Sequence, residues 1–226
     1  RYHLASNSHF FNDFVAAIFI FPLFFKLKRR YYYAKPQKSQ EKFAKNEIVR
    51  YNVEKSSSKG YKMNVAILSD IHSNSHALEA CLQYALNQGV TAFLFLGDYV
   101  GEMAYPQKTM HRLYELQKQY DCYFVKGNKE DYWLREWKIG DNNWKEYDSE
   151  TGFLYYAYHN LTEKDLQFFD SLSHVQRIQF DELPGLTICH GSTIDSNGKM
   201  TSGTEATKAL MEAETSQIIF CGHTHV

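Results

Sequence analysis

Short, nearly continuous runs of apolar residues recur along the chain and end in glycine or polar residues. The runs cover Met63–Leu68, Ala92–Leu96, Cys122–Val125, Leu186–Cys189 and Ile218–Cys221. Apolar runs of about four to eight residues between turn signals are typical of buried strands. The pattern therefore predicts five buried strands.

Segments with helical periodicity separate these strands. The first carries apolar residues at Leu78, Cys81, Leu82, Ala85 and Leu86. We expect Ser75 to cap this helix and Gly89 to end it. The alternation of strand, helix and strand predicts that Ala92–Leu96 runs parallel to Met63–Leu68.

Three further helices follow from the same periodicity and from capping residues. One carries Met110, Leu113 and Leu116, one begins after Thr162 as its cap, and the last covers Glu205–Glu214. Val175–Phe180 and Leu186–Cys189 flank a short turn segment and predict a hairpin.

The segment from Lys129 to Asn160 is rich in tryptophan, tyrosine and charged residues. Two interpretations stay open for it. We favour helices that pack on the sheet through aromatic anchors, and the alternative is an aromatic belt in a binding cleft.

Polar side chains suited to metal binding follow all five predicted strands. They are Asp70, His72, Asp98, Asn128, His190, His223 and His225. Open α/β sheets gather ligands at the carboxyl ends of their strands. Mixed oxygen and imidazole ligands suit Mn, Fe, Zn or Ni better than an all-oxygen Mg or Ca site. Seven such ligands predict two metal ions, and Asp98 is the candidate to bridge them. The histidines at positions 111, 159 and 174 are expected to have no role in the site.

The order of these motifs resembles that of the calcineurin-like metallophosphoesterases, in particular their small, cap-less bacterial and archaeal phosphodiesterase branch. The motifs are Asp70-Ile71-His72, Gly97-Asp98, Gly127-Asn128, His190-Gly191 and Gly222-His223-Thr224-His225. The resemblance covers residues 63–226. It implies an α/β (α+β) fold in which two packed mixed β-sheets are flanked by helices as a four-layer sandwich.

The resemblance also implies a division of the ligands and a reaction. Asp70, His72 and His225 would hold the first metal ion, Asn128, His190 and His223 the second, and Asp98 would bridge them. The cofactors would be two divalent ions, with manganese as the first expectation and Fe, Zn, Ni or Mg as alternatives. A hydroxide activated by both ions would attack a phosphodiester or phosphomonoester such as a small phosphoester or a nucleotide.

The sequence departs from the family pattern at three places. Residues 99–103 lack the arginine with which protein phosphatases and dinucleoside-tetraphosphatases of the family clasp phosphate, so we expect neither activity. Lys129 stands where many relatives have a histidine that can donate a proton. We expect Lys129 mainly to bind substrate, and the alternative is a solvated side chain with no role. The leaving-group acid stays unassigned. The chain stops at Val226, directly after the last ligand, so a truncated C-terminus with an exposed sheet edge is a further expectation.

Charge divides the 226-residue chain into two parts. Residues 26–62 hold twelve Lys or Arg against three Glu, whereas residues 63–226 hold twelve basic against twenty-two acidic residues. The apolar run Phe14–Phe25 is shorter than the roughly 20 residues that a membrane-spanning helix needs. We therefore expect residues 1–62 to be a basic tail or linker outside a catalytic unit of residues 63–226. The alternative is an arm that contacts nucleic acid or a membrane surface.

The four cysteines form no CxxC pair and predict reduced core residues in a cytoplasmic protein. We expect a small phosphoester as the partner, and neither nucleic acid nor a membrane. A protein-binding scaffold on the same fold is the main alternative. The complete ligand set favours the enzyme over the scaffold. A nuclease ranks third because the acidic catalytic part would repel a polyanion.

Overall fold

The fold is described by a computed structural model of residues 17–23, 63–140, 142–180 and 185–225. In chain order the elements are β1 (Ala17–Leu23), β2 (Met63–Ser69), α1 (Ser75–Asn87), β3 (Ala92–Phe95), α2 (Pro106–Gln117), β4 (Asp121–Phe124), α3 (Asn128–Ile139), α4 (Gly152–His159), α5 (Glu163–Ser171), β5 (Val175–Ile178), β6 (Leu186–Cys189), α6 (Glu205–Ala213) and β7 (Ile218–Phe220). All five predicted ligand-bearing strands are present.

The described strands form two mixed sheets. The first has the order β1-β2-β3-β4, with β1 antiparallel to β2 and the other neighbours parallel. The second has the order β5-β6-β7, with β5 and β6 as the predicted hairpin and β7 parallel to β6. Parallel pairing places the carboxyl ends of β2, β3 and β4 at one edge of the first sheet, and those of β6 and β7 at one edge of the second.

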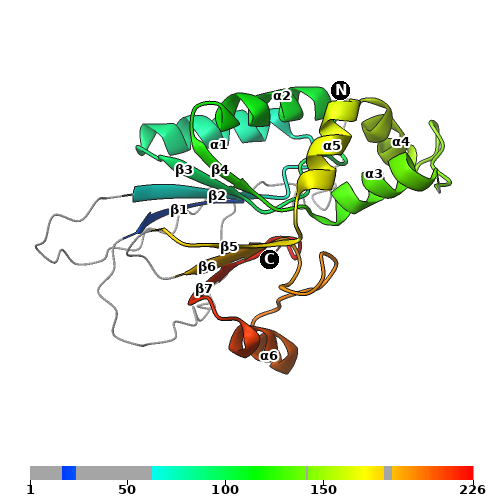
Figure 1. Cartoon of the computed structure of the whole chain (residues 1–226). Coiled ribbons are helices and arrows are strands. Elements are labelled where there is room, and N and C mark those ends of the chain that lie inside the picture. The colour runs from blue at the N-terminus through cyan, green and yellow to red at the C-terminus, as the bar shows by residue number, and fades with distance from the viewer. Residues whose placement is uncertain (1–16, 24–62, 141, 181–184, 226) are drawn as a thin grey trace, which may run out of the picture.

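The sheets are stacked between helices in four layers (Figure 1). Helices α1, α2, α3 and α5 lie over one face of the first sheet, the second sheet covers its other face, and α6 lies beyond the second sheet. Leu68, Phe93 and Phe95 belong to the core shared with the helices. Their strand neighbours, such as Ile67 and Leu94, belong to a second core shared with β5 and β6. The prediction of two packed mixed sheets in a four-layer sandwich is confirmed.

Most helix predictions hold, and one cap prediction is wrong. Thr162 caps α5, and its hydroxyl accepts a hydrogen bond from the Asp165 N–H. Helix α1 is capped by Asn74 rather than by Ser75, because the Asn74 side chain accepts the Ala77 N–H at 3.0 Å and Ser75 already has helical geometry. Asn and Ser are both good N-cap residues and are adjacent here, so the sequence alone did not show which of them caps the helix.

The aromatic segment forms α3 and α4, and its anchors pack into the helix-side core. Trp133 is fully buried and its ring contacts that of Trp144. Trp137 and Tyr158 pack against the same core. The favoured interpretation, in which aromatic anchors hold the helices on the sheet, is confirmed for these residues.

Strand β1 lies inside the segment that the sequence analysis places outside the catalytic unit. It pairs with the whole of β2, from Ala17 opposite Ser69 to Leu23 opposite Met63. The remainder of residues 1–62 lies outside the described residues, including the basic segment 26–62. That the catalytic unit begins at Met63 stays a prediction. Its test is whether the protein keeps its fold and activity without β1.

Among the described residues, no helix is both long enough and apolar enough to cross a membrane. Among the described residues, none of the four cysteines forms a disulfide, and Cys189 is buried.

Candidate metal centre

The residues that follow the central strands meet where the two sheets adjoin, and the backbone there is unusual. Among the described residues, the non-glycine residues with positive φ are Asp70, His72, Ser73, Asp98, His223 and His225. Five of these six are predicted metal ligands. A left-handed backbone is uncommon outside glycine and costs conformational energy, so its concentration at one place points to a functional site.

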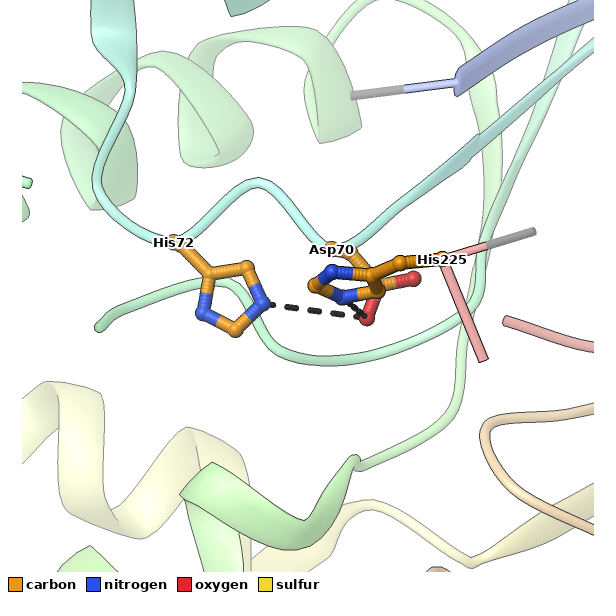
Figure 2. A group of neighbouring side chains, drawn as sticks. All are labelled: Asp70, His72 and His225. Atoms are coloured by element: carbon orange, nitrogen blue, oxygen red, sulfur yellow. Dashed lines mark hydrogen bonds and ion pairs between the residues drawn. The ribbon is translucent and has the colours of Figure 1, made fainter. Parts of the chain in front are cut away.

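The carboxylate of Asp70 joins the first and the last motif of the chain (Figure 2). Its Oδ1 atom lies 3.0 Å from Nε2 of His225 and 3.7 Å from Nε2 of His72. Oδ2 accepts hydrogen bonds from the Ser69 hydroxyl at 2.5 Å and from the backbone N–H of His223 at 3.1 Å. Burial alone would raise the pKa of Asp70, but its contacts with the imidazoles of His225 and His72 hold it well below its usual range. Asp70 is therefore ionised at neutral pH.

A second group forms around Asp98 and His190. Oδ2 of Asp98 lies 3.3 Å from Nε2 of His190 and 3.7 Å from Nε2 of His72. Nε2 of His190 also lies 3.0 Å from Oδ1 of Asn128. Asp98 thus stands between the group of Asp70 and His72 and the group of His190 and Asn128, which is the position that a bridging carboxylate needs.

All seven predicted ligands lie in this one region. Asp70, His72 and His225 offer ligand atoms within 4.8 Å of one another, and so do Asp70, Asp98 and His190. The ring of His223 lies 5.0 Å from that of His190. The first trio has the membership that the family resemblance gives to the first metal ion. The second trio contains the predicted bridge together with one ligand of the second ion.

Hydrogen bonding fixes the orientation of His190. Its Nδ1 atom lies 2.8 Å from the backbone oxygen of Leu96, which can only accept, so Nδ1 carries a proton. Nε2 is then the atom available to a metal ion. Burial lowers the pKa of His190, but the charges of Asp98 and Asp70 outweigh burial and raise it to about 9.

Glu130 was not predicted from the sequence, and its buried carboxylate joins the exits of β3 and β4. It accepts backbone N–H groups of Asp98 at 2.8 Å, Gly127 at 2.8 Å and Tyr99 at 2.9 Å. Burial and the charge of Asp98 raise the pKa of Glu130 to about 7. A glutamate at the third position of a helix that begins after a glycine is a capping signal and could have identified it.

Gly127 allows these two strand exits to come close together. A Cβ atom at this position would overlap the Asp98 carboxylate and approach its backbone nitrogen to 2.6 Å. The N–H of Lys129 then donates to Oδ1 of Asp98 at 3.0 Å, which leaves Oδ2 directed at the histidines.

Glu102 is a second residue that was not predicted from the sequence, and it contacts both His72 and Lys129. Its Oε2 atom lies 2.7 Å from Nδ1 of His72, and its Oε1 atom lies 2.5 Å from Nζ of Lys129. The predicted substrate-binding lysine is therefore at the edge of the site and paired with a carboxylate. No pattern in the sequence marked Glu102, because residues 99–106 carry no periodic signal.

Comparison with known proteins agrees with this geometry. Residues 63–226 match the calcineurin-like phosphoesterase family. Over 67 residues the chain is 40% identical to the uncharacterized protein MJ0912 of Methanocaldococcus jannaschii, a stretch that covers 30% of this chain and 26% of that protein.

Two solved structures share the fold. The metallophosphoesterase of Sphaerobacter thermophilus has a TM-score of 0.57 and 26% identity, with 73% of this chain and 61% of that one covered. The hypothetical protein PH1004 of Pyrococcus horikoshii OT3 has a TM-score of 0.59 and 17% identity, with 70% of this chain and 68% of that one covered. The chain spans about a quarter of MJ0912 and under two thirds of the Sphaerobacter structure.

The fold and the clustered carboxylates and imidazoles define a metallophosphoesterase. The chain belongs to the calcineurin-like phosphoesterase family, whose members hydrolyse phosphoesters with the help of metal ions. The donor set fits such ions, because carboxylate oxygens and imidazole nitrogens lie within 4.8 Å of one another and are atoms that divalent transition metals take as ligands.

Proposed function

We propose that the chain hydrolyses a phosphoester bond of a small phosphodiester, phosphomonoester or nucleotide, using two divalent metal ions. Asp70, His72 and His225 would hold the first ion. Asn128, His190 and His223 would hold the second, and Asp98 would bridge both. Manganese is the proposed metal, since a mixed set of carboxylate, amide and imidazole ligands suits it.

The observation that carries this proposal is the convergence of donor atoms from five strand exits on Asp70 and Asp98. Nε2 atoms of His72 and His190 lie 3.7 Å and 3.3 Å from Oδ2 of Asp98, and both rings are almost fully buried. Two bound cations would supply Lewis-acid polarisation of the phosphoryl oxygens and a water of lowered pKa.

The residues of this chain have the supporting roles. The Lys129 N–H turns one oxygen of Asp98 away from the histidines, so that the other oxygen faces both metal positions. Glu130 keeps the backbone of Asp98 in its left-handed conformation through hydrogen bonds to the N–H groups of Asp98 and Tyr99. The Lys129 ammonium is the candidate to contact an anionic substrate oxygen. The cysteines without disulfides support the cytoplasmic location that we also propose.

The test is hydrolysis of a chromogenic bis-phosphodiester together with metal analysis of the purified chain. We expect about two equivalents of metal and Mn-dependent turnover in the wild type. Asp98→Asn should reduce turnover by orders of magnitude and lower the metal content, because an amide is a poor bridging ligand. Asp121→Asn is the matched control, since Asp121 is exposed at the start of β4. Full turnover by metal-depleted protein, or by Asp98→Asn, would contradict the proposal.

A further inference from the structure

Glu102 occupies a position between a predicted metal ligand and the lysine at the edge of the site. One carboxylate oxygen lies 2.7 Å from Nδ1 of His72 and the other lies 2.5 Å from Nζ of Lys129. The side chains of His72, Lys129 and Glu102 are 4%, 14% and 21% exposed, so these contacts are shielded from water. Contacts shielded in this way are screened less by salt than an ion pair on the surface.

The loop that carries Glu102 is built around His72. The His72 N–H donates to the Asp98 carbonyl at 2.9 Å, and the His72 carbonyl accepts the Met103 N–H at 2.9 Å. Gly101 lies against the imidazole itself, since a Cβ there would come within 2.5 Å of Nδ1. The Gly101 N–H donates to the Ser73 hydroxyl at 3.0 Å. The backbone therefore fixes where the Glu102 side chain begins, close to the ring.

This contact determines which edge of the His72 ring faces the ligands. With Nδ1 lying 2.7 Å from Oε2 of Glu102, Nε2 points to Asp70 and Asp98, at 3.7 Å from an oxygen of each. A carboxylate that accepts the remote N–H of a metal-bound histidine fixes the ring and makes it a better ligand. The second oxygen of Glu102 holds the Lys129 ammonium, whose Nζ atom lies 5.7 Å from the centre of the Tyr132 ring and 5.2 Å from that of Phe153.

We propose that Glu102 is a positioning residue with two separable tasks. It orients His72 for the first metal ion, and it holds the Lys129 ammonium at the edge of the substrate site. The inference rests on the proposed function, since it assumes that His72 binds metal. Glu102 is not one of the seven proposed ligands, and its two contacts connect the metal site with Lys129 at the edge of the substrate site.

The test is calorimetric titration of Mn²⁺ into the full chain after removal of metal. Glu102→Ala should weaken binding at one of two sites by roughly 10- to 100-fold, the usual cost of losing such a carboxylate. Glu102→Gln should recover most of that affinity, because the amide oxygen can still accept the Nδ1 proton. The recovery by Gln distinguishes orientation of the ring from a general effect on folding.

Two controls complete the design. Glu79→Ala removes a carboxylate whose Oε2 lies 2.8 Å from Nε of Arg112, a comparable contact away from the ligands, and should leave Mn²⁺ affinity unchanged. Lys129→Met removes the second partner of Glu102 and should also leave Mn²⁺ affinity nearly unchanged. Imidazole NMR of Zn²⁺-loaded protein should show a hydrogen-bonded Nδ1 proton on His72 that disappears in Glu102→Ala.

The outcomes separate this inference from the proposed function. Failure of the wild type to bind Mn²⁺ would overturn the proposed function itself. Two Mn²⁺ sites in the wild type with unchanged affinity in Glu102→Ala would overturn the role of Glu102 alone. Equal loss in Glu102→Ala and Glu102→Gln, with the Nδ1 proton retained, would also overturn it.

Discussion

The carboxylate of Asp70 accepts a hydrogen bond of 3.1 Å from the backbone N–H of His223, which lies 153 residues further along the chain. This bond joins the exit of β2 in the first sheet to the exit of β7 in the second. The ring of His225 contacts the other oxygen of the same carboxylate (Figure 2). Asp70 is thus both a predicted ligand and a contact between the sheets.

We expect Asp70→Ala to lower the stability of the metal-free protein as well as its metal binding. The substitution leaves the His223 N–H and the Ser69 hydroxyl without their acceptor, and an unsatisfied buried polar group costs about 1–3 kcal/mol. Urea unfolding of metal-free protein measures this loss, with Asp121→Ala as the exposed control. Unchanged unfolding of Asp70→Ala would show that the carboxylate has no structural role.

Metal binding should release protons at neutral pH. Burial lowers the pKa of His72, but Asp70, Glu102 and Asp98 outweigh burial and raise it to about 10, and the pKa of His190 is about 9. Both imidazoles are protonated at pH 7 in the metal-free protein and must lose a proton to bind metal. Apparent affinity should therefore rise between pH 7 and pH 10. Calorimetry in buffers with different ionisation enthalpies counts the protons, and zero release at pH 7 would contradict the prediction.

The same shifts predict how the stability of metal-free protein depends on pH. The folded pKa of His72 and of His190 lies above the unfolded value near 6.5, so their charge pairs stabilise the fold fully below about pH 6.5. This contribution is lost as the pH rises through 9 and 10. Unfolding measured between pH 6.5 and pH 10 should show a decline, and the decline should be smaller in His72→Gln.

A chain that begins at Met63 should fold and hydrolyse small substrates. All seven predicted ligands follow Met63, and residues 63–225 supply the buried residues described for the two cores. Removal of β1 does expose the edge of β2, with which β1 pairs over its whole length. A chain that begins at Ala17 keeps β1 and is the matched control. A large fall in turnover or melting temperature in the shorter chain only would make β1 part of the catalytic unit.

The sequence predicts the metal ligands better than it predicts the residues that position them. The strands and the ligands after them are local signals, because a buried strand followed by Asp98 or His190 can be recognised without knowing its neighbours. Asn74 could not be separated from Ser75, since two adjacent residues had equal capping chemistry. Glu102 could not be found at all, because its role comes from contacts with His72 and Lys129, which are distant in sequence and meet only in the folded chain.

In the folded chain Lys129 has neighbours that the sequence did not indicate. Its ammonium is paired with Glu102, and its Nζ lies 5.2 Å from the centre of the Phe153 ring. The negative charge of Glu102 offsets the positive charge of Lys129, so this lysine attracts an anionic substrate less strongly than an unpaired lysine would. We therefore expect a moderate role in binding: Lys129→Met should raise KM for a phosphodiester by a factor of about ten or less, corresponding to roughly 1.4 kcal/mol.

The same variant separates binding from proton donation. If Lys129 only binds, kcat should change little for every substrate, whether its leaving group is acidic or basic, because removal of uniform binding raises KM alone. A series of aryl and alkyl phosphodiesters measures this, with Lys118→Met as the control, since Lys118 pairs with Glu115 on the exposed surface. A loss of kcat confined to alkyl leaving groups would make Lys129 the proton donor. In that case Lys129→His, which restores the residue common among relatives, should recover turnover of the alkyl substrates.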